Sequence, residues 1–265
     1  MTPSSEIRAV TAEADDAQCA QVPLLYHELR PEPSAYSYVL PCSRFAEHLR
    51  MFARLRREAP GSYVPLVTFD DGHLSNHTHA LPMLDDACVK AHFFITAGWT
   101  GTRDGYMEPR HLRELHAAGH TLGAHSWSHA LLTGCSDVEL RRELCDAKSS
   151  LQDWIGAPVT SLSLPGGRGD ARVLRACREA GYTTVWTSVP GVTRSAVEPV
   201  VGRFNILAGM ADAALERLLD PASGALQRAR RISRAKAAAQ HLLGDSMYAR
   251  LWALVNRQEV EGAPQ

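Results

Sequence analysis

The sequence has no long hydrophobic run, and no window approaches the roughly eighteen consecutive apolar residues that a membrane-spanning helix requires. The N-terminal stretch also lacks the apolar core of a Sec-type signal peptide and instead contains four acids, Glu6, Glu13, Asp15 and Asp16. These absences predict a cytoplasmic protein without a membrane span.

A Cys-x-x-Cys pair is also missing, and the six cysteines lie far apart in the chain. This distribution excludes the dense disulfide framework that is typical of small secreted domains. We therefore expect reduced, mostly buried thiols.

Neither sign of charge dominates, since the net charge is −1 and the sequence pI is about 6.9. Overall charge therefore predicts no nucleic-acid partner and no general attraction to an anionic membrane. One stretch near the C-terminus is different, because it contains several cations and no acid: Arg228, Arg230, Arg231, Arg234 and Lys236. A basic helix of this kind suits contact with a membrane surface, although a solvated helix face is the simpler interpretation. Nothing in the sequence indicates an oligomeric state.

What the chain does have is length and apolar content, with 265 residues of which 45% are hydrophobic, enough for one substantial core. Strand-like runs cover residues 22–27, 63–69, 91–96, 120–124, 161–164, 183–187 and 200–206. Helical patterns alternate with them at residues 43–58, 76–87, 109–118, 137–155 and 170–180. Ser43 and Asp137 suit helix N-caps, while Gly119, Gly156 and Gly181 follow the last apolar turns.

Seven strands alternating with helices predict an α/β protein whose parallel sheet closes into a distorted (β/α)7-type barrel. We expect three parts: a disordered tail over residues 1–20, the barrel over residues 21–210, and a helical extension over residues 211–265 that packs on the barrel. In such a barrel the functional groups gather at the carboxyl ends of the strands.

Two motifs stand at expected strand ends. Val67 to Gly72 reads Val-Thr-Phe-Asp-Asp-Gly, and His125 to His129 reads His-Ser-Trp-Ser-His. Adjacent buried carboxylates repel each other, so a cation is needed to neutralise one of them. A divalent metal bound by one aspartate and by two histidines at i and i+4, which share one face of a helical turn, meets that need.

These motifs resemble those of the polysaccharide deacetylase family, also called the NodB-homology or carbohydrate esterase 4 family. The resemblance runs from about residue 22 to residue 191. It implies that Asp70 is the catalytic base and that Asp71, His125 and His129 bind one divalent metal ion. Zn²⁺ is the first expectation, and Ni²⁺, Co²⁺ and Mn²⁺ are alternatives.

The chain departs from the family pattern in the third motif, where an arginine would orient the base. The segment from Ser163 to Arg168 reads Ser-Leu-Pro-Gly-Gly-Arg, so the arginine is missing from its usual place. Arg168 is the first candidate to replace it as a catalytic residue, and Arg203 is the second.

A second departure is that the family's C-terminal Leu-x-His, whose histidine protonates the leaving group, is missing from its usual place. Leu24 to His27 supplies the same pattern near the N-terminus. The first and last strands of a closed barrel are neighbours, so moving one strand along the sequence preserves the site. The chain thus resembles the circularly permuted branch, which includes poly-N-acetylglucosamine deacetylases, and His27 is the expected general acid.

Four further residues are expected around the substrate. A backbone N–H in the turn at Gly166 and Gly167 is placed to bind an oxyanion, because glycine lets the chain approach closely. Tyr26 and Trp127 are expected to form walls for an acetyl group or a sugar ring. His73, His77 and His79 form a rival histidine cluster that we interpret as surface or supporting residues.

The sequence therefore predicts a metal-dependent hydrolase that removes an N-acetyl or related N-acyl group from an amino sugar, either linked to a small molecule or in a polymer. The expected cytoplasmic location favours the small-molecule-linked substrate. The alternatives are a cyclic imide or ureido amidohydrolase of the same fold, and a non-catalytic carbohydrate-binding relative. An iron(II) oxygenase also uses two histidines and a carboxylate, but the order of residues and the α/β pattern do not suit it.

Overall fold

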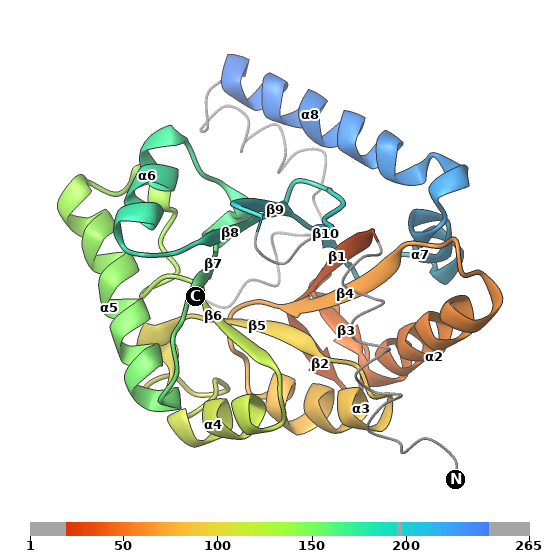
Figure 1. Ribbon diagram of the computed structural model, residues 1–265, viewed down its shortest axis with the longest axis horizontal. Helices are drawn as coiled ribbons and strands as arrows, with labels where there is room; N and C mark the ends of the chain where they lie inside the picture. The colour runs from red at the N-terminus through yellow and green to blue at the C-terminus, as the bar shows by residue number, and fades with distance from the viewer. Residues whose placement is uncertain (1–19, 195–197, 244–265) are drawn as a thin grey trace, which may run out of the picture.

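The fold is a nearly closed barrel of parallel strands surrounded by helices, as seen in a computed structural model that describes residues 20–194 and 198–243 (Figure 1). The main sheet has eight strands in the order β10-β1-β4-β5-β6-β7-β8-β9. Their bounds are β1 Gln21–Tyr26, β4 Val64–Phe69, β5 Ala91–Ile95, β6 Thr121–Ala124, β7 Ser161–Ser163, β8 Thr184–Thr187, β9 Val200–Gly202 and β10 Phe204–Asn205. The predicted α/β barrel is confirmed.

The seventh predicted strand is divided in the structure. Its first half, β9, pairs with β8, whereas its second half, β10, pairs with β1 at the opposite edge of the sheet. Arg203 is the single residue between the two halves. The chain at Arg203 therefore closes the barrel between its first and last strands.

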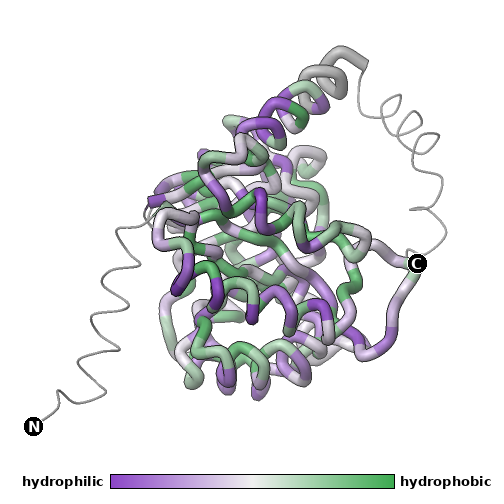
Figure 2. The backbone as a smooth tube through the Cα atoms, turned by 90° about the vertical axis from the view of Figure 1, so that its right-hand side faces the viewer, coloured by the Kyte–Doolittle hydropathy of each residue, from purple (hydrophilic) through white to green (hydrophobic). Residues whose placement is uncertain are grey.

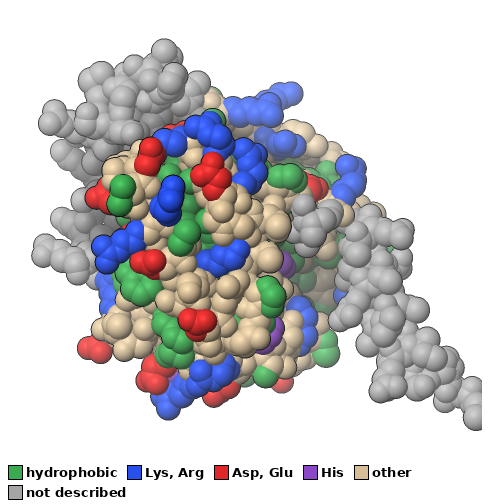
Figure 3. Space-filling model, turned by 60° about the vertical axis from the view of Figure 1, so that its left-hand side comes forward, with side chains coloured by type: hydrophobic (Ala, Val, Ile, Leu, Met, Phe, Trp, Pro, Cys, Tyr) green, Lys and Arg blue, Asp and Glu red, His purple; other side chains and the backbone are tan. Residues whose placement is uncertain are grey.

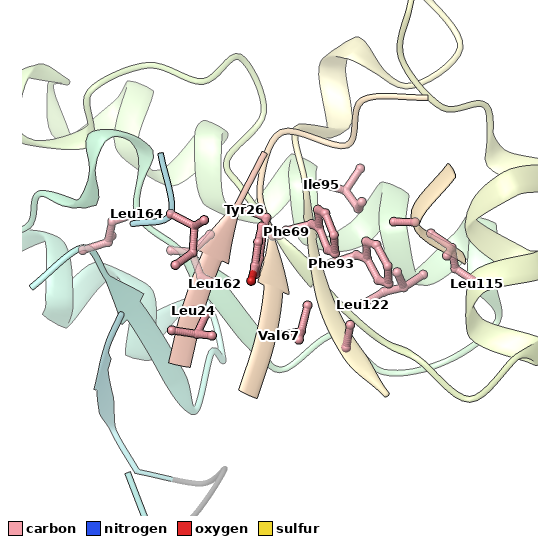
Figure 4. Close-up of a cluster of buried hydrophobic side chains, with 14 of the residues drawn as sticks. Leu24, Tyr26, Val67, Phe69, Phe93, Ile95, Leu115, Leu122, Leu162 and Leu164 are labelled. Carbon is pink, nitrogen blue, oxygen red and sulfur yellow. The ribbon is translucent and has the colours of Figure 1, made fainter. Parts of the chain in front are cut away.

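The core is formed by apolar side chains that project from adjacent strands toward the surrounding helices (Figure 4). Tyr26, Phe69 and Phe93 lie side by side on β1, β4 and β5, and the Phe69 and Phe93 rings are stacked with centroids 5.2 Å apart. Tyr26 is 1% exposed, and its hydroxyl lies 3.1 Å from His48 Nδ1. The rows of aromatic rings set the spacing between the sheet and its helices.

Helices follow the strands around the barrel. Their bounds are α2 Cys42–Glu58, α3 Leu81–Asp86, α4 Pro109–Ala117, α5 Asp137–Ile155, α6 Ala171–Glu179, α7 Asp212–Leu219 and α8 Ala225–Leu243. Short helical turns are η1 Asn76–Ala80, η2 Ala97–Trp99, η3 Leu132–Gly134, η4 Pro165–Gly167 and η5 Pro221–Ser223. The predicted helix over residues 76–87 begins as the π-helical turn η1 and continues as α3. A small parallel pair, β2 Glu28–Arg30 and β3 Val39–Pro41, was not predicted, because each strand has only three residues.

Two of the expected N-caps are wrong by one or two residues. Helix α2 begins at Cys42 after Pro41, and α5 is capped by Ser136, whose hydroxyl accepts a hydrogen bond from the Glu139 amide. A serine hydroxyl one residue earlier satisfies this amide, so Asp137 lies inside the first turn. The expected end at Gly156 is confirmed, since this glycine adopts φ 69°.

The C-terminal helices differ in how they contact the barrel. Helix α7 packs against it, with the Tyr63 amide donating to Leu219 O over 2.8 Å and Arg44 paired with Asp212 at 2.5 Å. Helix α8 extends away from the barrel (Figure 2), and the side chains of Arg228 and its basic neighbours are exposed or partly exposed. The expected three-part division and the membrane contact stay predictions, and residues 1–19 and 244–265 lie outside the described residues.

Acidic and basic side chains are interspersed on the face around α5 and α6, so this face has no patch of a single charge (Figure 3). Within residues 20–194 and 198–243, no helix combines the length and apolarity needed to cross a bilayer.

The five described cysteines are free, as expected, but only Cys177 is buried. The expectation of mostly buried thiols is wrong because the other four lie in helices or loops that face solvent in part.

Buried histidines predict a loss of stability in acid. Burial lowers the pKa of His48 to about 4 and that of His92 to about 4. The unfolded chain binds protons on these groups near pH 6.5, so stability is present above that pH and is lost as pH falls toward 4. For His48, which is 1% exposed, the loss is on the order of 3 kcal/mol. Urea unfolding at a series of pH values measures it.

The matched variants are His48→Gln, expected to flatten the pH dependence, and His116→Gln at an exposed helix position, expected to leave it unchanged. An identical decline in wild type and in His48→Gln between pH 6.5 and 4 would contradict the assignment.

Candidate active site

The candidate site lies at the carboxyl ends of β1, β4, β6 and β7, where a barrel of parallel strands places its functional groups. Strands β1 and β4 pair with Tyr26 opposite Phe69, and the Asp70 amide donates to Tyr26 O over 3.0 Å. The next residues, His27 and Asp70, therefore leave their strands at the same level.

Asp71, His125 and His129 form a compact cluster at this end of the barrel. One ligand atom from each lies within 4.8 Å of the others. His125 Nε2 and His129 Nε2 lie 3.3 Å and 3.4 Å from Asp71 Oδ1, a buried oxygen without a hydrogen-bond partner among the described residues. Two imidazole nitrogens and one carboxylate oxygen are the donor set of many catalytic zinc sites, so the cluster fits a divalent ion.

Asp71 has a strained backbone conformation in the cluster. Its φ is 73°, a left-handed conformation that is uncommon for a residue with a side chain, and Gly72 follows at φ 82°. The two left-handed residues turn the chain sharply away from β4. A strained conformation at the end of a strand indicates a side chain whose direction matters.

The tautomer of His125 is fixed by the backbone. His125 Nδ1 lies 2.9 Å from the Ser163 carbonyl oxygen, which can only accept, so the proton is on Nδ1 and the Nε2 lone pair faces Asp71. Burial alone would lower the pKa of His125, but the nearby charges of Asp70 and Asp71 raise it above its usual value. This arrangement is typical of a metal-binding histidine.

The two histidines are not on a helical turn, so the expectation based on i,i+4 spacing is wrong. Residues 125–131 form a loop in which Ser126 and His129 adopt φ 61° and 65°. The His129 amide donates to Ser126 Oγ over 3.0 Å, and the two imidazole centroids lie 4.9 Å apart. Left-handed turns bring the rings together where a helix was expected.

Glu143 on α5 holds this loop and was not identified from the sequence. Its carboxylate accepts hydrogen bonds from the Trp127 amide at 2.9 Å, the Ser128 amide at 2.8 Å and the Ser128 hydroxyl at 2.6 Å. Glu143 lies 15 and 16 residues away from the two amides that it binds, so no local sequence pattern indicates the contact. Only the packing of α5 against the loop brings it there.

Asp70 is bound on both carboxylate oxygens. Arg203 lies 2.6 Å from Asp70 Oδ1 and 2.8 Å from Oδ2, and the Ser163 hydroxyl donates to Oδ2 over 2.8 Å. Burial would raise the pKa of Asp70, but the positive charge and hydrogen bonds of Arg203 outweigh it and lower the pKa. Asp70 is therefore an ionised carboxylate beside the metal-type cluster.

Arg203, the second candidate from the sequence, lies beside the Asp70 carboxylate, where Arg168 was the first candidate. Arg203 is fully buried, whereas Arg168 is exposed on the loop after η4. Placing Arg168 at Asp70 is wrong, because the turn at Gly166 and Gly167 directs the chain outward. The guanidinium that reaches the acid comes instead from the junction of β9 and β10.

His27 lies at the end of β1 within electrostatic reach of Asp70 and Asp71. Its ring meets Tyr38 edge-on with centroids 4.7 Å apart, and its Nδ1 is buried without a hydrogen-bond partner among the described residues. Burial lowers the pKa of His27, while both aspartates act to raise it. The sequence-based placement beside the acids agrees with the structure.

The residues that were expected to contact the substrate have different environments in the structure. The Gly167 amide donates to Leu164 O over 2.7 Å, so it is not free to bind an oxyanion, and the role of Gly166 stays a prediction. Tyr26 is buried in the core behind the sheet, which makes its role as a substrate wall wrong. Trp127 is partly buried and packs against the core beside Gly98.

The rival histidines do not form a second metal cluster among the described residues. His77 Nε2 is paired with Glu114 at 2.5 Å, and His73 Nδ1 lies 2.8 Å from Ser75 Oγ. Supporting roles suit His73 and His77, and no contact places His79 in the site.

Metal binding is expected to depend on the three clustered residues. Asp71→Asn and His125→Ala should each lower the bound metal from about one ion per chain to a small fraction, because each removes a ligand. Elemental analysis of the purified protein measures this. In wild type, added Zn²⁺ at 100 times its Kd should raise the free energy of unfolding by about 2.7 kcal/mol. Equal metal content in wild type and both variants would contradict the assignment.

The contact from Glu143 predicts a smaller effect at a distance from the ligands. Glu143→Gln keeps the shape but cannot accept three hydrogen bonds as a charged group does, so His129 loses support. Outer contacts of this kind change metal affinity about 10- to 100-fold. Competition titration with a zinc chelator measures the Kd, and exposed Glu139→Gln on the same helix serves as the control. Unchanged affinity in Glu143→Gln would show that the loop holds itself.

Comparisons with known proteins identify similar sequences and folds. Residues 57–185 match the family model described as polysaccharide deacetylase. The chain is 27% identical over 156 residues to a Bacillus subtilis protein named putative polysaccharide deacetylase YxkH, covering 58% of this chain and 56% of the relative. It is 32% identical over 120 residues to a Bacillus cereus peptidoglycan-N-acetylglucosamine deacetylase, covering 45% of this chain and 54% of the relative.

Solved structures share the fold. The Streptococcus pyogenes deacetylase PplD superposes with a TM-score of 0.66 at 20% identity, covering 76% of this chain and 99% of that one. IcaB from Ammonifex degensii superposes with a TM-score of 0.63 at 22% identity, covering 79% and 97%. The chain spans about half the length of the two curated relatives. The matched residues 57–185 include the acidic pair and both histidines, so this segment of the chain is similar to the polysaccharide deacetylase family.

Proposed function

We propose that this protein is a metal-dependent N-deacetylase that hydrolyses the amide bond of an N-acetylated amino sugar. The observation that carries the proposal is the division of roles between two adjacent acids. Asp71 faces two histidines, whereas both oxygens of Asp70 are bound by Arg203 and Ser163 while its Oδ2 lies 3.8 Å from His125 Nε2. Such a pair separates metal binding from proton transfer.

Asp70 is suited to accept a proton from the attacking water. Its lowered pKa, which the charge of Arg203 causes against the effect of burial, keeps it ionised at neutral pH. The bidentate contact also fixes the direction of the carboxylate, which reduces the reorganisation needed when the proton moves. Asp70 is therefore the catalytic base, and Arg203 and Ser163 are positioning residues.

His27 is suited to donate a proton to the departing amine. It leaves β1 beside Asp70, within electrostatic reach of both aspartates, and an imidazole is the side chain that exchanges protons near neutral pH. Its origin in the first strand supports the circularly permuted branch of the family, because β1 lies between β10 and β4 in the sheet. His27→Ala is expected to lower kcat while metal content stays unchanged.

A divalent ion held by Asp71, His125 and His129 would supply Lewis-acid polarisation of the amide and a lowered pKa of bound water. Zn²⁺ suits two nitrogen ligands and one carboxylate best, and Ni²⁺, Co²⁺ and Mn²⁺ are the alternatives that elemental analysis distinguishes. The fit of the residues rests on Asp71 Oδ1, which lacks any other partner among the described residues.

For the substrate, we favour an N-acetylated polysaccharide over a small-molecule-linked sugar, because a relative with 32% identity is named for peptidoglycan N-acetylglucosamine. The test is an acetate-release assay on N-acetylglucosamine oligomers with metal-loaded protein. Activity that a chelator removes and Zn²⁺ restores supports the proposal. Absence of acetate release from every N-acetylated oligomer by fully metal-loaded protein would overturn it. The cytoplasmic location remains a prediction.

A further inference from the structure

The loop between β5 and α4 carries three side chains that the proposed chemistry leaves unused, Trp99, Arg103 and Tyr106. The Trp99 ring stacks on the His129 ring, with centroids 5.2 Å apart and an interplanar angle of 29°. Trp99 also meets the Tyr106 ring edge-on at 4.8 Å. All three side chains are partly exposed, so an accessible aromatic surface adjoins the metal-type cluster.

Arg103 rests on this surface. Its guanidinium carbon lies 4.5 Å from the Trp99 ring centroid and 5.0 Å from that of Tyr106. Among the described residues, no carboxylate pairs with Arg103 and no acceptor receives a hydrogen bond from its side chain. A partly buried guanidinium has five N–H donors, and leaving them without acceptors is costly unless a ligand or water supplies these.

Aromatic rings also lie beside His27 at the end of β1. Tyr36 and Tyr38 lie between β2 and β3 with ring centroids 5.6 Å apart, and Tyr38 contacts His27. The His73 ring meets that of Tyr106 edge-on, with centroids 5.7 Å apart. Tyr36 and Tyr38 therefore add aromatic surface near His27, whereas the surface formed by Trp99 and Tyr106 carries Arg103.

Resting on the proposed deacetylase function, we propose that Trp99, Arg103 and Tyr106 form a subsite for a sugar next to the reacting one, and that this sugar carries an anionic group. The apolar face of a sugar ring packs on indole and phenol rings. A guanidinium matches the geometry of a carboxylate or a phosphate through two parallel hydrogen bonds. The nearby acid Glu28 is already paired with Arg30, which reduces its repulsion of an anion.

The experiment compares three N-acetylglucosamine oligomers of equal length: a neutral one, one whose alternate sugars carry a carboxylate, and one whose alternate sugars carry a phosphate. Arg103→Gln should lower kcat/KM on a charged oligomer about 10-fold or more, chiefly through KM, and on the neutral oligomer less than about 3-fold. The larger loss identifies the anion. The preference of wild type should also weaken as salt is raised.

Arg142→Gln, on an exposed face of α5, is the matched control and should leave kcat/KM unchanged on all three oligomers. Metal content is measured in every variant, since a merely structural loss would lower it. Equal losses on charged and neutral oligomers, or no loss on either charged one, would overturn the subsite. Calorimetric binding of the same oligomers to wild type and Arg103→Gln decides the matter even if no acetate is released, so failure of the deacetylase function is distinguished from failure of the subsite.

Discussion

Asp70→Asn is expected to lower kcat for acetate release about 10²- to 10⁴-fold while the protein retains its metal. The amide cannot accept the proton of the attacking water, and the loss is of the size found when a general base is removed. Metal content should stay near the wild-type value, because Asp70 is not among the three clustered ligands. Initial rates and elemental analysis of the same preparation measure both quantities.

Ser163→Ala is the matched control for Asp70→Asn. It removes the 2.8 Å hydrogen bond to Asp70 but leaves the carboxylate and its contact with Arg203. We expect a loss below about 10-fold, the size of one hydrogen bond. If Asp70→Asn kept activity, or lost its metal together with activity, the separation of the two acids into base and ligand would be wrong.

Arg203→Met is expected to destabilise the protein by about 3–5 kcal/mol, because it leaves the buried Asp70 carboxylate without its cation. Loss of the guanidinium charge raises the pKa of Asp70 above its wild-type value, so the base becomes protonated at pH values where wild type keeps it ionised. The acidic limb of the pH–rate profile should move to higher pH. Guanidinium unfolding and the pH dependence of kcat/KM measure the two effects.

Arg203→Lys keeps the charge without the bidentate geometry and should recover part of the stability but little of the rate. Arg168→Met tests the other arginine, which is exposed, and should change stability by less than about 0.5 kcal/mol. If Arg168→Met lost more stability than Arg203→Met and shifted the pH–rate profile, Arg168 and not Arg203 would be the residue that positions Asp70.

Two buried groups of opposite charge type, Asp70 and His48, both make the stability of the protein depend on pH. Asp70 is stabilised as an anion by a buried cation, whereas His48 is held neutral because burial disfavours its charged form. The first contributes stability at neutral pH that is lost only in strong acid. The contribution of His48 begins to be lost as the pH falls below about 6.5, the ordinary pKa of histidine.

Much of the barrel could be predicted from the sequence, because strand and helix signals are local. The alternation of apolar strands and amphipathic helices located all seven strand regions, and the parallel order followed from it. The two motifs at strand ends could be assigned to one site for the same reason, since parallel strands bring their carboxyl ends together. What the pattern could not give was the break at Arg203, because β9 and β10 read as one continuous strand.

The acids and imidazoles that meet in the site could be identified from local residues, since they directly follow strands β4 and β6. The residues that hold them in place could not: Arg203 reaches Asp70 from 133 positions away, and Glu143 binds the histidine loop from a helix. The chain contains many arginines and glutamates, and nothing near these two in sequence distinguishes them. Closure of the barrel and packing of α5 bring them to the site, because long-range contacts depend on how whole elements pack and not on local propensity.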